Sequence, residues 1–527
     1  MKKTTILTSL LIVFTCFISI AQETIYVSAT GAGAMDGTSE SNAYGNFGNA
    51  MNQINSAGDK LIVIGAINPT GQNLSSKNFA FTIEGLDSNS VLGSSGTSRL
   101  FTINSATSAN VTFKNLTFLN NNTTLAGGSV FYNNNAGATA SFENCTFNGN
   151  SVSNAAGGGA IYFANGNLSI SNCSFVNNSS DDEGGAIFLQ SGTTTITNSI
   201  FETNDATTKG GAIHLNNGDL TIANCTFLNN TAANNGGAIA GIGSGNLTIS
   251  GSLFNGNMGN RGGGIAITNN SRELVMSFST FVNNTATSID GGALYLGGTN
   301  ANSSITNTTV FNNSVINATL NQSKGGGIRL EGARPFTINN SLIYGNFVDD
   351  NNGATNTSDI GVTPATVVTL DHSITQKIEP ALDDTAGDVF TTSLTEADLS
   401  ASNLSFNETS GYVEYNSVSV GTDSPIDFGS DDNDAGAWDS GLTLSVNDVS
   451  QDDLSIYVNY DYKTLEITHN LNENLSIELF NMLGSKVMDA KNITQNHSLS
   501  VNHLKTGVYV LSGKSSGKSF AKKLIIK

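Results

Sequence analysis

The chain has 527 residues, and its 42 acidic residues exceed its 22 basic ones, so its formal net charge is −20. This charge argues against nucleic acid as a partner, because affinity for nucleic acid comes largely from Lys and Arg on phosphates. It also argues against docking on an anionic membrane surface. Glycine is abundant, with 57 residues, but the regular spacing of Phe, Ile and Leu argues against a disordered low-complexity chain.

Residues 1–21 have the pattern of a secretory signal peptide. Lys2 and Lys3 form a positive region, an apolar run reaches Ile20, and Ala21 completes a small-x-small cleavage site before Gln22. No later stretch is apolar over the length needed to cross a bilayer. We therefore expect an exported chain with no transmembrane segment after cleavage.

Residues 22–110 are expected to form an N-terminal cap and the first coils of the repeat that follows. Phe47, Met51 and Ile54 are spaced for one face of a short helix. Such a helix is expected to cover the open end of the repeat.

Residues 111–375 contain a sequence repeat with a period of 26 to 28 residues. A fixed period in this range indicates a solenoid. Within each period apolar and polar residues alternate, which predicts three short strands, and Asn and Gly interrupt them at turns. Each strand is expected to pair with its own copy about 4.8 Å away in the next coil. The core positions are Ile161, Ile187, Ile213, Ile239 and Ile265, together with Phe147, Phe175, Phe201, Phe227, Phe254 and Phe281.

Asparagine recurs at two turn positions of the repeat. Asn tolerates the left-handed conformation that turns need, and stacked amides can hydrogen-bond from coil to coil. Paired glycines allow a further sharp corner. The first column is Asn115, Asn144, Asn172, Asn198, Asn224, Asn307 and Asn340, and the second is Asn150, Asn178, Asn204, Asn230, Asn257 and Asn284.

Three cysteines remain after the predicted cleavage, and each follows an asparagine of the first column. An odd number leaves at least one thiol free in an exported chain. We predict that Cys145, Cys173 and Cys225 serve as small buried hydrophobic residues.

The pairing of "FxxN" with "GGA[IL]" resembles the repeat of the chlamydial polymorphic outer-membrane proteins, and the match runs from Phe118 to Ile328. These proteins are surface adhesins built on right-handed parallel β-helices. The segment 23–65 also resembles the entry segment of secreted β-helix proteins. The resemblance implies an all-β, pectate-lyase-like right-handed parallel β-helix. The autotransporter barrel of that family is not evident, so a different export route is expected.

Residues 376–445 are expected to form a closing segment and a linker. The run at 424–441 resembles the closing segment of secreted β-helix proteins. It contains Asp431, Asp432 and Asp434, which suggest either calcium or a solvated turn. The turn is favoured because no bidentate Glu completes a calcium loop, and we expect no metal and no other cofactor.

Residues 446–527 lose the period and predict a small antiparallel β-sandwich. The stretches "IELFNMLGSKV", "LSVNHLKTGVYVL" and "KKLIIK" resemble the type IX secretion sorting domain of Bacteroidetes, with Gly484, Gly507, Tyr509 and Lys523 at its motif positions. The resemblance implies the type IX machinery as a partner, secretion across the outer membrane, cleavage, and attachment to surface lipopolysaccharide in many cases. The alternative is an unrelated sandwich, for instance one that binds carbohydrate.

One outward column of the repeat is aromatic. We predict an exposed ridge for glycan binding, because an exposed aromatic strip on a soluble surface indicates a binding site. The alternative is that another part of the chain covers the strip. The ligand-binding residues are taken to be Tyr162, Phe188, His214 and Tyr295, in a column that reads Phe131, Tyr162, Phe188, His214, Ala240, Ala266, Tyr295 and Arg329.

Two other functions fit the same fold less well. A polysaccharide lyase needs a base beside a uronate carboxylate and a cation for the enolate; its candidates here are Lys209, His214, Arg261, Glu183, Glu202 and Asp205. Several of these lie in one column before the glycine pair, which fits a surface ion-pair ladder better, and we assign no catalytic residue. An ice-binding array is also disfavoured, because Val275 and charged residues interrupt the outward Ser and Thr columns.

The sequence therefore predicts a β-helix protein that is either secreted or anchored at the outer surface of the outer membrane. We expect it to be adhesin-like or glycan-binding, with an extracellular glycan or a host or cell surface as its partner. Whether it is also an enzyme stays open, with a binding protein favoured.

Overall fold

A computed structural model describes residues 22–379, the strands 404–407 and 412–415, and much of 454–526. The predicted signal peptide, most of the predicted linker, and the acidic run at Asp431, Asp432 and Asp434 lie outside the described residues. The chain divides into two compact units, 1–207 with 212–219 and 208–211 with 220–527, and each is described by itself. Within 22–379, the undescribed residues are 70, 94–97, 105–108, 155–156, 269–270, 299–301, 317–324, 333–334, 350–354, 364–366, 372 and 376–377.

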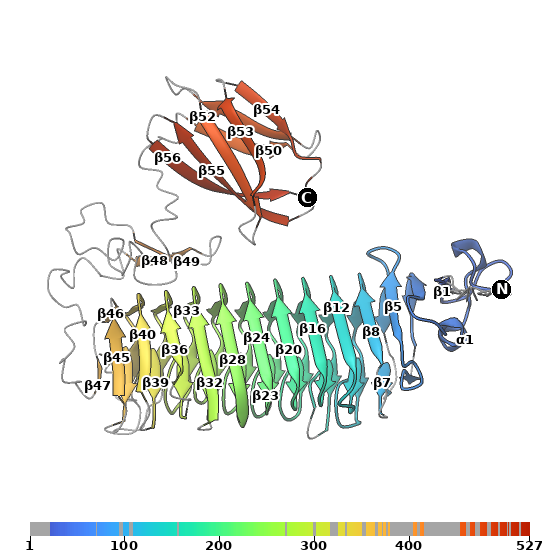
Figure 1. Ribbon diagram of the computed structural model, residues 1–527. Helices are drawn as coiled ribbons and strands as arrows, with labels where there is room; N and C mark the ends of the chain where they lie inside the picture. Colours follow the sequence, from blue (N-terminus) through green and yellow to red (C-terminus); the bar gives the residue numbers. More distant parts are fainter. Residues whose placement is uncertain are drawn as a thin grey trace, which may run out of the picture. The chain divides into compact units, whose positions relative to one another are not determined.

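The repeat folds into a parallel β-solenoid of about ten turns, which confirms the predicted fold class (Figure 1). Each full coil contributes one strand to each of four sheets, A, B, C and D. The sequence predicted three strands per coil. The fourth, in sheet D, is only two residues long in most coils, too short for an alternating pattern to reveal it.

The first unit contains the N-terminal coils. Sheet A has β1 (Thr24–Ser28), β2 (Lys60–Ile64), β5 (Ala80–Gly85), β8 (Asn110–Lys114), β12 (Thr139–Glu143), β16 (Asn167–Ser171) and β20 (Thr193–Thr197). Sheet B has β3 (Ala66–Ile67), β6 (Val91–Gly93), β9 (Thr117–Leu119), β13 (Thr146–Asn148), β17 (Ser174–Val176) and β21 (Ile200–Glu202). Sheet C has β4 (Gln72–Asn73), β7 (Phe101–Ile103), β11 (Phe131–Asn133), β15 (Ile161–Phe163), β19 (Ile187–Leu189) and β23 (Ile213–Leu215). Sheet D has β10 (Asn122–Thr123), β14 (Ser151–Val152), β18 (Ser179–Ser180) and β22 (Asp205–Ala206).

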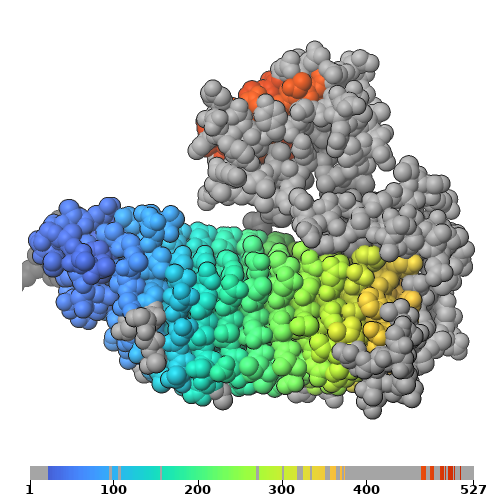
Figure 2. All heavy atoms as spheres, turned by 180° about the vertical axis from the view of Figure 1, so that it is seen from behind, coloured from blue at the N-terminus to red at the C-terminus, as the bar shows by residue number. Residues whose placement is uncertain are grey.

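The second unit continues the same four sheets, and Figure 2 shows its green and yellow coils in direct contact. Sheet A has β24 (Asp219–Ala223), β28 (Ser244–Ser250), β32 (Ser271–Ser277), β36 (Ser304–Thr306), β40 (Pro335–Asn339) and β45 (Val367–Asp371). Sheet B has β25 (Thr226–Leu228), β29 (Leu253–Asn255), β33 (Thr280–Val282), β37 (Thr309–Phe311), β41 (Leu342–Tyr344) and β46 (Ile374–Thr375). Sheet C has β27 (Ile239–Gly241), β31 (Ile265–Ile267), β35 (Leu294–Leu296), β39 (Ile328–Leu330), β44 (Ile360–Val362) and β47 (Ile378–Glu379). Sheet D has β26 (Thr231–Ala232), β30 (Met258–Gly259), β34 (Thr285–Ala286), β38 (Ser314–Val315), β42 (Phe347–Asp349) and the antiparallel β43 (Thr355–Thr357).

Like residues stack in the core of the solenoid. The predicted columns of five isoleucines and six phenylalanines are fully buried. The phenylalanine rings lie face to face in successive coils, with centroids 4.3 Å apart for Phe147 and Phe175 and 4.4 Å apart for Phe254 and Phe281. Stacked rings of one size suit the close packing of native cores, which are as dense as organic crystals.

The second asparagine column is a buried hydrogen-bonded ladder. The Oδ1 of Asn178 accepts both the backbone N–H and the Nδ2–H of Asn150, at 3.1 and 2.9 Å. The Nδ2 of Asn178 also donates to the carbonyl of Phe147, at 3.0 Å. In the second unit Asn257 and Asn284 repeat the pattern, with both bonds to Oδ1 between 2.9 and 3.0 Å.

Left-handed backbone occurs at two corners of the coil. All seven asparagines of the first column have φ between +47° and +55°, as predicted. In the second column the left-handed residue is instead the one before each ladder asparagine, such as Asn177 or Asn283, at φ +55° and +56°. The ladder residues themselves therefore supply side-chain amides rather than an unusual backbone.

The three cysteines are buried and free, as predicted. Cys173 also accepts a hydrogen bond, because its Sγ lies 3.4 Å from the backbone N of Cys145. Serine takes the same role in other coils, where the Oγ of Ser199 accepts from Cys173 and that of Ser252 from Cys225, both at 3.1 Å. A weakly polar thiol suits this position, because the position is buried but still faces one backbone N–H donor.

The predicted N-terminal helix is present. It is α1 (Phe47–Gln53), preceded by the short 3-10 helix Glu40–Asn42, and the Oδ1 of Asn46 caps it by accepting from the N of Asn49 at 2.9 Å. Phe47, Met51 and the following Ile54 are buried, and the ring of Phe47 lies 6.0 Å from that of Phe101. The helix thus packs its apolar face on the first coils.

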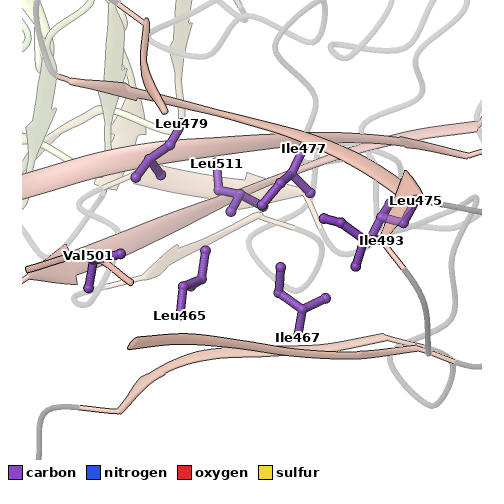
Figure 3. Packing of buried hydrophobic residues seen from close by; sticks show 8 residues of the cluster. All are labelled: Leu465, Ile467, Leu475, Ile477, Leu479, Ile493, Val501 and Leu511. Atoms are coloured by element: carbon purple, nitrogen blue, oxygen red, sulfur yellow. The ribbon is translucent and has the colours of Figure 1, made fainter. Parts of the chain in front are cut away.

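The C-terminal part forms two small antiparallel sheets, as predicted. One has β50 (Leu454–Asn459), β51 (Thr464–His469) and β54 (Asn496–Ser500); the other has β53 (Lys486–Ile493), β52 (Leu475–Asn481), β55 (Gly507–Ser515) and β56 (Lys518–Ile526). A separate hairpin pairs β48 (Leu404–Asn407) with β49 (Tyr412–Tyr415). Figure 3 shows the core between the two sheets, formed by Leu465, Ile467, Leu475, Ile477, Leu479, Ile493, Val501 and Leu511.

The inside and outside positions of one coil predict very different mutational costs. Phe227 is fully buried and stacks on Phe254 at 4.6 Å, so Phe227→Ala should lower the free energy of unfolding by about 3–5 kcal/mol. Thr221 is exposed on sheet A, so Thr221→Ala should change it by less than about 0.5 kcal/mol. Denaturant unfolding of both variants measures the difference, and equal effects would contradict the register described above.

Candidate binding surface

The predicted aromatic column lies at the outward positions of sheet C. Strand pairing aligns Tyr132 with Tyr162, Tyr162 with Phe188, and Phe188 with His214. The placement of Phe131 in this column is wrong, because Phe131 pairs with the core residue Ile161 and is fully buried. Tyr132 takes its place in the column. Ile161 and Phe131 are 30 residues apart rather than 26, so the period alone misplaced the earlier coil by one residue.

The prediction that this column is an exposed ridge is wrong for most of its length. Phe188, His214 and Tyr295 are 3%, 0% and 4% exposed. The ring faces are covered because neighbouring coils stack them, with centroids 5.1 Å apart between Tyr162 and Phe188 and also between Phe188 and His214. A charged side chain from the turn before a strand also contacts His214, since a carboxylate oxygen of Glu183 lies 3.3 Å from its Nε2.

Tyr132 and Tyr162 are the part of the column in the first unit that remains partly exposed. Their rings are 5.0 Å apart, and the guanidinium of Arg99 lies 4.2 Å from the centre of the Tyr132 ring. Gly127, at φ +100°, passes so close to Tyr132 that a Cβ there would lie 2.2 Å from the ring. Burial, with the neighbouring Tyr132, raises the pKa of Tyr162. Neither phenol donates to a protein acceptor within the described residues.

The second unit has a polar cluster at the same column. The hydroxyl of Tyr295 donates to Glu331 at 2.6 Å, and Glu331 lies 3.1 Å from the Nη2 of Arg329. The guanidinium of Arg261 lies 4.4 Å from the centre of the Tyr295 ring. Burial and the bond to Glu331 raise the pKa of Tyr295, and the hydrogen bonds from Tyr295 and Arg329 outweigh burial and lower the pKa of Glu331. The Tyr295 hydroxyl is therefore already engaged within the protein.

The residues proposed for lyase chemistry are only partly brought together. Glu183 and His214 form a contact, but His214 is fully buried. Lys209 and Arg261 lie in one column with Asn235 between them, while Glu202 and Asp205 lie on β21 and β22. In the part of the chain that the structure describes, no three His, Cys, Asp or Glu side chains gather as metal ligands.

The outward face of sheet A is rich in hydroxyl side chains. Strand pairing aligns Ser141 with Thr112 and Ser169, and Thr248 with Thr221 and Val275. Val275 is 36% exposed and interrupts the column, and Lys114 with Glu143 forms an ion pair of 2.8 Å beside it. This face offers many weak hydrogen-bonding groups and no regular array of one side chain.

Sequence reasoning missed one exposed aromatic residue, Phe278. It occupies the corner that belongs to the first asparagine column, has φ +48°, and is 45% exposed. The signal was present in the sequence, because "SFST" at 277–280 stands where another coil has "ANCT" at 223–226, so that Phe occupies the Asn position.

Comparison with known proteins agrees with both halves of this description. Residues 101–281 match the right-handed β-helix region, and residues 455–527 match the secretion system C-terminal sorting domain. No curated protein matches the chain. The helices of the described residues include none long and apolar enough to span a bilayer.

The sorting domain indicates the export route of the chain. It implies handling by the type IX secretion machinery, as in Bacteroidetes, and delivery outside the cell or to its outer surface. The solenoid and this domain together establish the class of protein. The chain is a right-handed parallel β-helix protein that carries a type IX C-terminal sorting domain.

Proposed function

We propose that this protein is an adhesin-like binding module that recognises an extracellular glycan through Tyr132 and Tyr162. The observation that carries the proposal is their position: two stacked, partly exposed tyrosines whose hydroxyls have no protein partner in the described residues. Tyrosine is frequent at binding surfaces because it combines a large ring with a polar end. The anchored guanidinium of Arg99 holds the first ring in place.

The geometry favours recognition by ring edges and hydroxyls rather than by ring faces. One face of Tyr162 is stacked on Tyr132 and the other on Phe188, so neither is available to a sugar ring. The phenol hydroxyls can both donate and accept, as sugar hydroxyls do. We therefore propose hydrogen bonding along the stacked edges as the main contact.

A polysaccharide lyase on the same fold is the weaker alternative. Its base would have to reach a substrate proton within hydrogen-bond distance. His214 is fully buried against Glu183, so this imidazole is poorly placed for that task. Unsaturated product from a uronate polysaccharide, lost in Lys209→Ala or His214→Ala, would favour the lyase instead.

The tyrosine pair gives a direct binding test. Tyr162→Phe removes one hydroxyl and keeps the stack, so binding to an immobilised glycan panel should weaken about fivefold, as expected for about 1 kcal/mol. Its thermal midpoint should stay close to that of the unchanged chain. Phe188→Ala is the contrasting variant: it removes a buried ring and should lower the free energy of unfolding by about 3–5 kcal/mol. Unaltered binding by both Tyr162→Phe and Tyr162→Ala would contradict the proposed contact.

We further propose that the mature protein stays attached at the outer face of the outer membrane after loss of its tail. Deletion of 446–527 should leave the chain in the periplasm, because the sorting domain is the part that the machinery handles. Cell fractionation with surface protease digestion measures the outcome. A truncated chain that still reaches the surface would show that the tail serves another purpose.

A further inference from the structure

Phe278 belongs to the first asparagine column of the second unit. The backbone N–H of each corner residue donates to the next coil: Gly251 to the carbonyl of Ser277 at 3.1 Å, and Phe278 to that of Thr306 at 3.2 Å. Asn224 and Asn307 make the same bond at 3.0 Å. The corner column therefore reads Asn, Gly, Phe, Asn in four successive coils.

The backbone of Phe278 is strained, and the fold does not compensate for it. A bulky side chain at φ +48° is a steric outlier, whereas Asn and Gly adopt this conformation readily. Thr203 is also left-handed, at φ +52°, but its hydroxyl bonds the Oδ1 of Asn177 at 2.6 Å. The side chain of Phe278 has no polar atom for such a bond. Because it is 45% exposed, burial of its ring adds little stability to offset the strain. Strain held without structural benefit indicates a functional site.

The surroundings leave one side of the ring open to solvent, whereas Asn307 occupies this corner in the following coil. The preceding coil has Gly251 at this corner, so no side chain stands there beside the ring. Among the described residues no second ring or cation lies against Phe278, unlike the stacked rings of sheet C. The hydroxyl residues Ser250, Ser277 and Thr306 are aligned on the neighbouring sheet A positions and are partly exposed.

We propose that Phe278 is a stacking platform for one sugar ring of a neutral polysaccharide, flanked by the hydroxyls of Ser250, Ser277 and Thr306. The negative face of an aromatic ring attracts the polarised C–H groups of a sugar face, and the nearby hydroxyls match those of the sugar. Stacking on a face is what the buried rings of sheet C cannot provide. This inference rests on the proposed glycan-binding function and names a second contact for it.

Two other occupants fit less well. A protein partner needs a larger apolar area at the centre of its interface, whereas Val275, 36% exposed, is the other exposed large apolar side chain of this coil among the described residues. An acidic polysaccharide would meet a chain of net charge −20, which repels it over a Debye length. These two arguments favour a neutral polysaccharide as the ligand.

The test uses Phe278→Asn, which restores the residue found at this corner in other coils. Affinity electrophoresis is run in gels that contain a soluble β-glucan, mannan or galactan. We expect at least one of these polysaccharides to retard the unchanged chain. The same polysaccharide should bind Phe278→Asn at least tenfold more weakly. The variant should melt at a higher temperature, because the strain is relieved. Phe278→Tyr should keep the binding. Met258→Gln removes an apolar residue of similar exposure, 39%, from sheet D and should leave binding unchanged.

The other outcomes are decisive. A lower melting temperature for Phe278→Asn, or binding equal to that of the unchanged chain, overturns the platform. Binding that falls in Tyr162→Phe but not in Phe278→Asn overturns the platform alone and leaves the proposed function standing. An unchanged chain that binds no glycan in either assay overturns both.

Discussion

The buried asparagine ladder is the interaction on which the solenoid depends. Each Oδ1 accepts two N–H groups from the preceding coil, as Asn178 does from Asn150, while each Nδ2 also satisfies a core carbonyl. A buried corner without these bonds would leave polar groups unpaired, each costing about 1–3 kcal/mol. At its end Asn346 donates to the buried Asp359, at 2.9 and 3.0 Å. A carboxylate can end the ladder, because the last asparagine needs only an acceptor for its two N–H groups.

Once the ladder fixes the register, every outward position repeats at the strand spacing of about 4.8 Å. Aromatic side chains in one column must then stack face to face, as Tyr132, Tyr162 and Phe188 do. Such a column presents ring edges and hydroxyls and hides ring faces. A face becomes available only where the neighbouring coil lacks a side chain, which is the situation of Phe278 beside Gly251. The same architecture thus limits which chemistry each surface can offer.

The fold could be predicted from the sequence because the period, the buried Ile and Phe columns and the turn asparagines are all local patterns. The site was harder to predict, because exposure depends on contacts between coils. The burial of His214 against Glu183 joins residues 31 positions apart, which no local sequence pattern reveals. Coil length also varies, so Phe131 was assigned the place of Tyr132. Phe278 was visible as a break in the asparagine column, but only the positive φ makes that break physically unusual.

The local organisation of a solenoid explains how a strained residue persists in it. Each coil contacts only its neighbours, so stability is close to a sum of coil and interface contributions. The cost of Phe278 therefore stays within its own coil, where Phe281 stacks on Phe254 at 4.4 Å and Asn284 continues the ladder. In a single compact core the same strain would act on the whole packing arrangement. A β-helix can therefore hold a strained binding residue at a corner of one coil, because the loss of stability is local and the strand register is kept.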